Sequence, residues 1–394
     1  MNTVTDANIQ HTRELTRAKH AEGMAAYQAQ GLRLARELDH RGPVRLDAND
    51  RLHPDILAAY WKHGFYIFEG VVGEAEVNEL RRDAAVMIEG APASPDAKVD
   101  ARGRPALGRD AAREPYTLIK PLSDPQGGTD FGEGRHPSKM AEPAPDSGAP
   151  AYVVLRMRGM CEYMSAGLRV YDHPHLLAIA ASINGDDFVP FNDVIFVKQP
   201  HVGGSVARHQ DGVTHWNSPD WNEGIHGFNY QVQIYPTTTG NALWVMPGTH
   251  KLGRADIKKR VADNGGSEQL PGAIPLICAP GDVTIVNRQT LHGSFANSSP
   301  DLRVSLTFGF HRRKSVLGQL TALTMKVPGL RYDEQRIFKR ASVIAVAIDA
   351  RRQYYPNEKA FFYQPFARRE DEFRFNQQTV DRVIHDYNEN DLAI

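Results

Sequence analysis

Short apolar runs, separated by proline, glycine and asparagine, recur through the second half of the chain. Runs of roughly four to eight apolar or alternating residues between such turn residues are typical of β-strands. The pattern predicts strands at 191–199, 228–235, 283–287 and 303–310. In the last of these, polar and apolar residues alternate, so Arg303, Ser305 and Thr307 are expected to share one face.

Helical composition dominates elsewhere. Residues 10–40 contain no proline and are rich in Ala, Leu, Glu, Arg and Gln, which predicts one long helix, or a pair around Gly31, packed as an arm on the rest of the chain or on a second subunit. Pro54 suits the first turn of a helix that Gly64 ends. In the first half of the chain, we predict helices at 10–40, 53–64, 74–88 and 151–182 and a strand at 65–69.

Residues 90–150 are rich in Pro, Gly, Ala and Asp and show no periodicity. A segment of this length is a functional lid or a disordered insertion, and we favour a partly ordered lid because 116–122 is apolar enough to pack. After residue 313, mixed-sign charge runs indicate solvated helix faces, and aromatic residues are expected to cover the core. We therefore divide the chain into an N-terminal helical arm (1–52), a main domain (53–313) that contains the insertion, and a C-terminal extension (314–394).

Composition narrows the class of protein. The 394 residues are 41% hydrophobic and carry a formal net charge of -1, which gives no reason to expect a nucleic-acid or membrane partner. Cys161 and Cys278 are the two cysteines, and so few in a long chain favour a reduced protein. The first residues lack the pattern of a signal peptide, so we expect a soluble cytoplasmic protein, with a homo-oligomer left open.

The candidate chemistry begins with a His-X-Asp pair. In an extended segment, His209 and Asp211 point to the same side while Gln210 points away. A second histidine, His292, follows the predicted strand 283–287. Two imidazoles and one carboxylate on one side of an ion leave positions open opposite, as in non-haem Fe(II) oxygenases. We therefore interpret His209, Asp211 and His292 as metal ligands and as the catalytic centre. His250 is excluded as a ligand because no acid lies two positions from it, and His173, at a predicted helix start without a third partner, is interpreted as a surface residue.

These residues also carry a family resemblance. The His-X-Asp pair, the distal HisGlySer that begins at His292, Arg303 eleven residues beyond it, and the segment 240–251 together resemble the phytanoyl-CoA dioxygenase family of Fe(II)/2-oxoglutarate oxygenases. The resemblance covers roughly Asp55 to Arg313, interrupted by the insertion. It implies a mixed α+β protein built on a double-stranded β-helix, a jelly-roll or cupin-like barrel, with flanking helices.

The resemblance implies Fe(II), 2-oxoglutarate and O₂ as cofactors and cosubstrates. Arginine suits the distal carboxylate of 2-oxoglutarate because its planar guanidinium forms two parallel hydrogen bonds, so Arg303 is assigned that role, with a hydroxyl from Ser305 or Ser294. The family places a lysine on the cosubstrate carboxylates in a region comparable to that of Lys120. Lys120 is a candidate for that role, but lysines are mostly solvated, so we favour an ordinary surface position for it.

The strand 228–235 leaves two registers open. Either its polar set, including Gln231 and Gln233, or its apolar set, including Tyr230 and Val232, faces the site. We favour the polar set, with the two glutamines bonded to cosubstrate, substrate or water. The loop after Asp211 is rich in aromatic residues and is either a substrate wall or a surface loop; its candidate substrate contacts are His215, Trp216, Trp221 and His226.

Taken together, the sequence predicts a dioxygenase that hydroxylates an unactivated carbon of a small molecule or biosynthetic intermediate and releases succinate and carbon dioxide. Related halogenases have a small residue at the position of Asp211, so its carboxylate favours hydroxylation. Desaturation, epimerisation or ring closure would use the same cofactors. A barrel that binds a metal and a ligand without turnover is the alternative from another class, and a zinc hydrolase is disfavoured because it would leave Arg303 without a purpose.

Overall fold

Two β-sheets and the helices that flank them form the structure, a computed structural model that describes residues 15–211, 226–320, 329 and 331–391. The larger sheet has eight strands in the order β1-β2-β10-β7-β12-β5-β4-β3. Their bounds are β1 Arg41–Pro43, β2 Phe65–Glu69, β3 Tyr116–Ile119, β4 Val153–Arg158, β5 Val189–Lys198, β7 Gly227–Gln233, β10 Val283–Asn287 and β12 Arg303–His311. Apart from the parallel β1–β2 pair, its strands run antiparallel to their neighbours.

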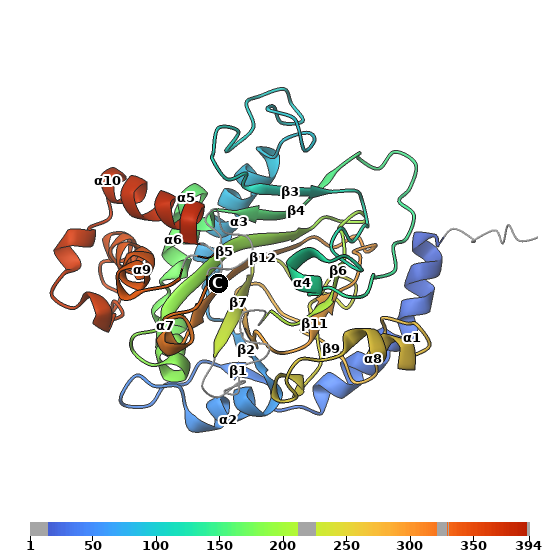
Figure 1. The fold of residues 1–394 in the computed structure, drawn as a ribbon, viewed down its shortest axis with the longest axis horizontal. Coiled ribbons are helices and arrows are strands. Elements are labelled where there is room, and N and C mark those ends of the chain that lie inside the picture. Colours follow the sequence, from blue (N-terminus) through green and yellow to red (C-terminus); the bar gives the residue numbers. More distant parts are fainter. Residues whose placement is uncertain (1–14, 212–225, 321–328, 330, 392–394) are drawn as a thin grey trace, which may run out of the picture.

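The smaller sheet has four strands in the order β6-β11-β8-β9. They are β6 Val206–His209, β8 Trp244–Val245, β9 Ile274–Pro275 and β11 His292–Ser294. The helices are α1 Arg17–Arg36, α2 Pro54–His63, α3 Glu74–Glu89, α4 Phe131–Gly134, α5 Met160–Tyr163, α6 Ser165–Tyr171, α7 Pro174–Asn184, α8 Ile257–Asp263, α9 Glu334–Tyr354 and α10 Gln377–Thr379. Figure 1 shows α6, α7 and α9 at one end of the large sheet and α1 and α8 beside the small one.

The outer face of the large sheet forms the main hydrophobic core. Tyr230, Val232, Leu306 and Phe308 alternate along β7 and β12 and are fully buried in a cluster that α3, α6, α7 and α9 complete. Such alternation buries one set of side chains per strand, and the opposite set faces the other way. The outer face therefore provides the hydrophobic burial that stabilises the fold, and the inner face is free to carry the side chains of a site.

Towards β2, the inner face of the large sheet is also apolar. Phe65, Ile67 and Val286 pack there against Leu243, Val245 and other residues around the small sheet. The two sheets are thus in contact through a second, smaller cluster. Beyond it, along β7 and β12, the inner face turns polar, and this change marks the position of the candidate site.

The predicted N-terminal helix is confirmed as α1, which begins after Thr16, and it packs on the small sheet. Tyr27 stacks on Trp244 with ring centroids 4.8 Å apart. Gly31 permits the close approach, because a β-carbon at this position would lie 2.5 Å from the Trp244 ring. The helix at 53–64 that ends at Gly64, the strand 65–69 and the helix at 74–88 are confirmed as α2, β2 and α3.

The prediction of helix throughout 151–182 is wrong at its start. Val153–Arg158 is strand β4, which pairs with β3 and β5 and extends the large sheet. Two β-branched valines and an alternation of buried and partly buried side chains suit a strand at this position. The remainder of the segment is helical, as α5, α6 and α7.

The insertion 90–150 is placed throughout, mostly without regular structure. Its apolar stretch forms strand β3, and Tyr116, Ile119 and Leu122 are buried as expected of a segment that packs. The segment before β3 projects beyond the sheet edge at the top of Figure 1. After β3, the insertion forms the short helix α4, which lies in space beside β6 and the candidate site.

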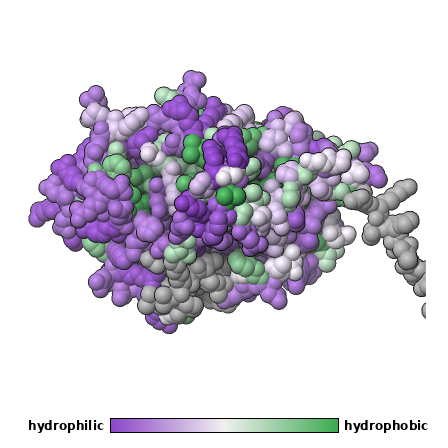
Figure 2. Space-filling model, turned by 90° about the horizontal axis from the view of Figure 1, so that it is seen from above, coloured by the Kyte–Doolittle hydropathy of each residue, from purple (hydrophilic) through white to green (hydrophobic). Residues whose placement is uncertain are grey.

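The face of the molecule seen in Figure 2 is mostly hydrophilic, with apolar residues in small separate groups. Within the described residues, no helix combines the length and the apolar character needed to cross a membrane. Cys161 and Cys278 are both buried and free, as predicted for a reduced protein. The architecture is mixed α/β with two sheets; the division into three domains stays a prediction.

Candidate metal centre and cosubstrate site

The two sequence-predicted histidines face each other across the small sheet. His209 ends β6, and His292 begins β11 in register opposite it, with ring centroids 4.1 Å apart. Gly293, next to His292, favours a close approach of the strands, because a β-carbon there would lie 3.0 Å from the Val206 carbonyl oxygen on β6, a tight contact. The HisGlySer sequence therefore lets the two ligand-bearing strands approach closely.

Each imidazole is oriented by a backbone carbonyl two residues before it. Nδ1 of His209 lies 2.8 Å from the Ala207 oxygen, and Nδ1 of His292 lies 2.8 Å from the Thr290 oxygen. A carbonyl only accepts, so both Nδ1 atoms carry the proton and donate it. In the neutral ring of this tautomer, Nε2 is the nitrogen that can offer its lone pair to a metal ion, the arrangement that ligating histidines normally show.

Asp211 completes the group. Its carboxylate oxygens lie 3.4 Å from Nε2 of His209 and 3.6 Å from Nε2 of His292. One potential ligand atom from each of these three residues lies within 4.8 Å of the others. The Asp211 backbone is fixed by Arg288, whose carbonyl accepts from its N–H at 2.7 Å and whose Nη2 donates to its carbonyl at 2.8 Å. The structure thus brings together all three predicted ligands.

Electrostatics favour the protonation states that a metal needs. Burial acts to raise the pKa of Asp211, but the hydrogen bond and charge of His209, together with His292 and Arg135, hold it well below its usual value. Burial, and then repulsion from His209, lower the pKa of His292 to about 4. The carboxylate is therefore ionised and His292 neutral near pH 7.

Arg303 lies on the inner face of β12 and is buried. Its Nε donates to Ser305 Oγ at 2.8 Å, Nη1 to the Asn241 carbonyl at 3.0 Å and Nη2 to Gln231 Oε1 at 2.8 Å. All three acceptors are neutral, and within the described residues no carboxylate lies at ion-pair distance from Arg303. A buried guanidinium without a counter-ion suits an anionic ligand.

The register of the strand 228–235 places its polar set with this arginine. Gln233 lies opposite Ser305 and accepts a hydrogen bond from it at 2.7 Å, and Gln231 bonds Arg303 directly. Asn229, on the same face, donates to Asp211 at 3.2 Å. The polar face of β7 thus joins the arginine cluster to the candidate metal ligands, while Tyr230 and Val232 face the outer core.

Sequence reasoning missed two residues at the centre. The insertion carries Arg135, whose Nη1 lies 3.1 Å from Asp211 Oδ1, and His136, whose ring lies 4.1 Å from that of His209. His136 is buried and donates from Nδ1 to the Ala207 carbonyl at 3.1 Å, so this oxygen accepts from both imidazoles. Neither residue belongs to a recognisable motif. The dipeptide Arg135-His136 itself was the one feature of the sequence that could have pointed to them.

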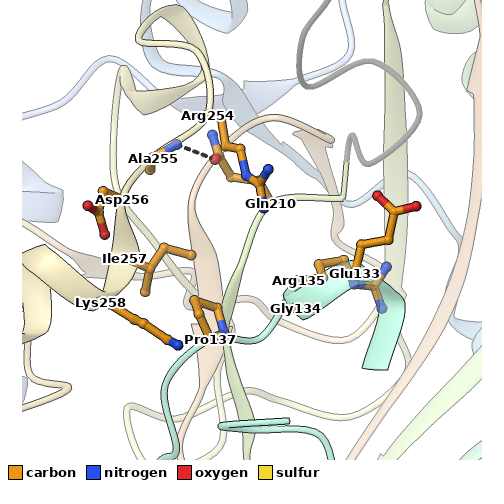
Figure 3. A pocket seen from close by; sticks show the side chains of 10 residues that line it. All are labelled: Glu133, Gly134, Arg135, Pro137, Gln210, Arg254, Ala255, Asp256, Ile257 and Lys258. Atoms are coloured by element: carbon orange, nitrogen blue, oxygen red, sulfur yellow. Dashed lines mark hydrogen bonds between the residues drawn. The ribbon is translucent and has the colours of Figure 1, made fainter. Parts of the chain in front are cut away.

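A pocket of about 410 Å³ adjoins the centre, with Arg135 in its wall. Figure 3 shows α4 and Arg135 on one side of it and the segment 254–258 on the other. Gln210 points away from the metal ligands into this wall, where it accepts from the Ala255 N–H at 2.8 Å. Its orientation agrees with the alternation predicted for the His-X-Asp pair.

Several other candidates lie apart from the metal group. Lys120 is exposed, with Nζ 4.0 Å from the centroid of the Tyr152 ring, and makes no contact with Arg303 within the described residues. His226 is buried between Tyr60 and Asn184, with its ring nitrogens 2.9 and 2.5 Å from their polar atoms. His250, excluded as a ligand on its sequence context, lies with Nε2 3.0 Å from the Trp61 carbonyl.

The remaining predicted contacts have different outcomes. Ser294 is buried on β11 and makes no hydrogen bond to Arg303 within the described residues. His215, Trp216 and Trp221 lie outside the described residues. His173, interpreted as a surface residue, is instead buried at the start of α7, remote in sequence from the ligand strands, because Pro174 and the helix pack over the core.

The donor set fits iron. Two imidazoles and one carboxylate on one side of an ion are the facial triad of non-haem Fe(II) oxygenases. The inner face of the large sheet also carries buried polar atoms without hydrogen-bond partners, among them Asn229 Oδ1, Thr284 Oγ1 and Thr307 Oγ1. Buried polar atoms are normally bonded, so unpartnered ones beside an arginine indicate a ligand-binding surface.

Residues 60–305, more than half of the chain, match the sequence model of the family described as phytanoyl-CoA dioxygenase (PhyH). The chain belongs to this family. A curated member, phytanoyl-CoA dioxygenase 1 of Oryza sativa subsp. japonica, is 30% identical over 116 residues, which are 28% of this chain. The match spans 40% of the length of that relative.

Solved structures of lower similarity include the protein EctD from S. alaskensis with 2-oxoglutarate and 5-hydroxyectoine, at 17% identity and a TM-score of 0.48, covering 75% of this chain and 92% of that one. The non-heme alpha ketoglutarate dependent epimerase SnoN from nogalamycin biosynthesis is 16% identical with a TM-score of 0.44, covering 71% and 94%. Because these TM-scores are low, membership rests on the sequence match.

Family membership and the donor set assign iron and 2-oxoglutarate as the cofactors.

Proposed function

We propose that the protein is an Fe(II)/2-oxoglutarate-dependent dioxygenase that hydroxylates an unactivated carbon of a small molecule or biosynthetic intermediate. The observation that carries the proposal is the convergence of Asp211 with Nε2 of His209 and of His292, which the polar face of β7 joins through Asn229 to the cluster around Arg303. In this proposal the two sheets form the double-stranded β-helix of the family, with the metal ligands on the small sheet and the cosubstrate side chains on the large one.

When bound, iron and 2-oxoglutarate supply the oxidation, with release of succinate and carbon dioxide. In our assignment, the side chains of this chain bind and orient. His209, Asp211 and His292 hold the metal, each imidazole kept in the correct tautomer by its carbonyl. Arg303 receives the distal carboxylate of 2-oxoglutarate, while Ser305, Gln231 and Gln233 fix the direction of its guanidinium.

Hydroxylation is favoured over halogenation because the carboxylate of Asp211 would occupy the position on the metal that a halide needs. Desaturation, epimerisation and ring closure use the same residues and depend on how the substrate lies. A metal-dependent binder without turnover is the alternative outside enzyme chemistry. The unpartnered polar atoms of the inner face support a bound ligand in either case.

The decisive experiment is succinate formation. Purified protein with Fe(II), ascorbate and 2-oxoglutarate is expected to release succinate, and a substrate screen followed by mass measurement is expected to find a product heavier by one oxygen. Asp211→Ala removes a charged ligand, so we expect succinate formation to fall at least a hundredfold. Asp263→Ala, on the exposed side of α8, is the matched control. Substantial activity of Asp211→Ala would exclude the ligand assignment, and a complete absence of succinate from the unaltered protein would favour the binder.

A further inference from the structure

A second group of arginines lies on the inner face of the large sheet, separate from Arg303. The register aligns Arg156 on β4 with Phe196 on β5, Phe196 with Ser305 on β12, and Ser305 with Gln233 on β7. Residues aligned across an antiparallel sheet project from the same face. Arg156 therefore faces the same side as the cosubstrate cluster, two strands away from Ser305, or about 10 Å.

Three more guanidinium groups surround this position. Arg158 follows two residues later on the same face of β4, opposite Val194, and its Nη1 donates to the Glu114 carbonyl at 3.1 Å. Arg135 reaches in from the insertion, where it pairs with Asp211. Arg113 lies just before β3. The group thus begins at the candidate metal ligands and extends along the sheet edge.

Within the part of the chain that the structure describes, Arg156 has no acidic partner to balance its charge. Its Nε is buried without a hydrogen-bond partner, and within the described residues it forms no ion pair. Burial, and then repulsion from Arg158, Arg135 and Arg113, lower its pKa to about 9. Within the described residues, the charged groups that shift the pKa of this guanidinium are Arg158, Arg135 and Arg113, and all three are cations.

Elsewhere the chain neutralises a buried arginine with acids. Arg351, on α9 behind the outer face, lies 2.7 Å from Glu76 and 2.5 Å from Glu358. Arg156 is partly buried, with its Nε shielded from water, and a shielded guanidinium nitrogen without such partners is costly unless a ligand supplies the negative charge. The contrast between Arg351 and Arg156 indicates that the latter has a binding role and is not a structural ion pair.

We propose that Arg156, with Arg135 and Arg158 beside it, binds an anionic group of the primary substrate, a carboxylate or a phosphate, at a site separate from Arg303. This proposal rests on the proposed function and names its substrate class. Arginine suits both groups, because its fork of N–H donors matches two oxygens of either one. The anion would anchor one end of the substrate while Asp211 and the histidines define the reacting end.

The test is anion binding measured by calorimetry, with hexanoate and hexyl phosphate as probes. The proteins are the unaltered chain, Arg156→Gln, and Arg102→Gln as a matched control, since Arg102 is a 63% exposed arginine of the insertion. We expect Arg156→Gln to weaken binding of the preferred probe at least tenfold, and Arg102→Gln to leave it unchanged. Arg135 is not used because it also contacts Asp211.

The second measurement separates substrate from cosubstrate. Binding of 2-oxoglutarate to the Fe(II) protein without oxygen, followed by its absorbance band, is expected to change less than twofold in Arg156→Gln. If this variant instead loses 2-oxoglutarate affinity and keeps probe binding, the arginine belongs to the cosubstrate site and the proposal is wrong. Failure of both probes to bind the unaltered protein, or equal binding to Arg156→Gln, also overturns it.

Two additions keep the result interpretable. If circular dichroism shows that Arg156→Gln is unfolded, Arg158→Gln takes its place. We expect this variant to weaken binding of the preferred probe severalfold. Unchanged probe binding by a folded Arg158→Gln would then overturn the proposal. The probe affinities are measured on metal-free protein as well. If the proposed function fails, the unaltered chain forms no succinate, yet anion binding at Arg156 stays measurable. The tighter of the two probes assigns the anion as carboxylate or phosphate.

Discussion

The guanidinium of Arg303 is held by three neutral acceptors, and this explains how a buried charge can be oriented without being neutralised. Ser305, Gln231 and the Asn241 carbonyl each take one N–H group. An acid in any of these places would pair with the arginine and compete with an anionic ligand such as the proposed cosubstrate. Burial lowers the pKa of Arg303 to about 10, so it still carries its charge near pH 7.

Arg303→Lys tests this arrangement. An ammonium cannot donate in the fixed fork of a guanidinium, so we expect the dissociation constant for 2-oxoglutarate to rise at least tenfold, equivalent to about 1.4 kcal/mol. The thermal unfolding midpoint without 2-oxoglutarate is expected to change much less. Arg33→Lys, at a 65% exposed position of α1, is the control. An unchanged 2-oxoglutarate affinity in Arg303→Lys would remove this residue from the cosubstrate site.

The sequence predicted that His209 and Asp211 lie together because strand geometry relates positions two apart to one face, and His292 was added from its place after the predicted strand 283–287 and from the family resemblance. It did not predict Arg135, His136 or Arg156. The first two come from an irregular insertion, where no period connects sequence to direction. Arg156 was assigned to a helix, and only the register of β4 places it on the inner face. A count of basic residues in the sequence therefore could not show that these arginines gather on the inner face of the sheet.

At the scale of elements, the insertion acts on the metal ligands as well as on the edge of the sheet. Arg135 pairs with Asp211, and His136 packs against His209 and shares its carbonyl acceptor. Groups that hold metal ligands in place commonly change metal affinity by about 10-fold to 100-fold when removed. The insertion therefore couples the ordering of residues 131–136 to the geometry of the ligands on β6.

We expect Arg135→Gln and His136→Leu each to weaken Fe(II) binding by roughly tenfold. The measurement is an anaerobic Fe(II) titration, which does not depend on turnover. Arg109→Gln, an exposed arginine of the same insertion, is expected to bind Fe(II) like the unaltered protein. If all three variants have the same affinity, the insertion does not support the metal ligands.

The docking of α1 on the small sheet offers a comparison within one helix. A β-carbon at Gly31 would lie 2.5 Å from the Trp244 ring, whereas one at Gly23 would meet nothing within 4 Å. We expect Gly31→Ala to destabilise the protein by about 1 to 3 kcal/mol through overpacking. Gly23→Ala should stabilise it by up to about 1 kcal/mol through helix propensity. Urea unfolding measures both; equal effects would show that α1 does not pack closely on Trp244.

At the scale of the whole molecule, the two faces of the large sheet separate stability from chemistry. The outer face buries aromatic and aliphatic side chains beneath α3, α6, α7 and α9. The inner face holds the polar and charged groups. The sequence allowed this division to be expected, because β7 and β12 alternate clearly. The strand order of the sheet, with β4 and β3 added at its edge, depends on pairings between distant segments that no local pattern encodes.

The outer core also contains an acid that should make global stability depend on pH. Asp193 is fully buried and accepts from the backbone N–H groups of Gly159 and Cys161 at 3.2 and 3.1 Å. Burial raises its pKa to about 7, while those hydrogen bonds oppose the shift. In the unfolded chain the same group titrates near its ordinary value of about 3.9. Between these two values the unfolded state is ionised and the native state is protonated, so rising pH favours unfolding.

We therefore expect the free energy of unfolding to contain an Asp193 contribution that falls by at most about 1.4 kcal/mol per pH unit up to pH 7 and is constant above it. Asp193→Asn cannot titrate. It should show a constant cost of about 1 to 3 kcal/mol for a lost hydrogen bond, without the slope. Urea unfolding of both proteins from pH 5 to pH 8 gives the difference, in which the other titrating groups cancel. A difference that does not vary with pH would mean that Asp193 is ionised in the native protein, and that the core beneath β4 and β5 tolerates a charge.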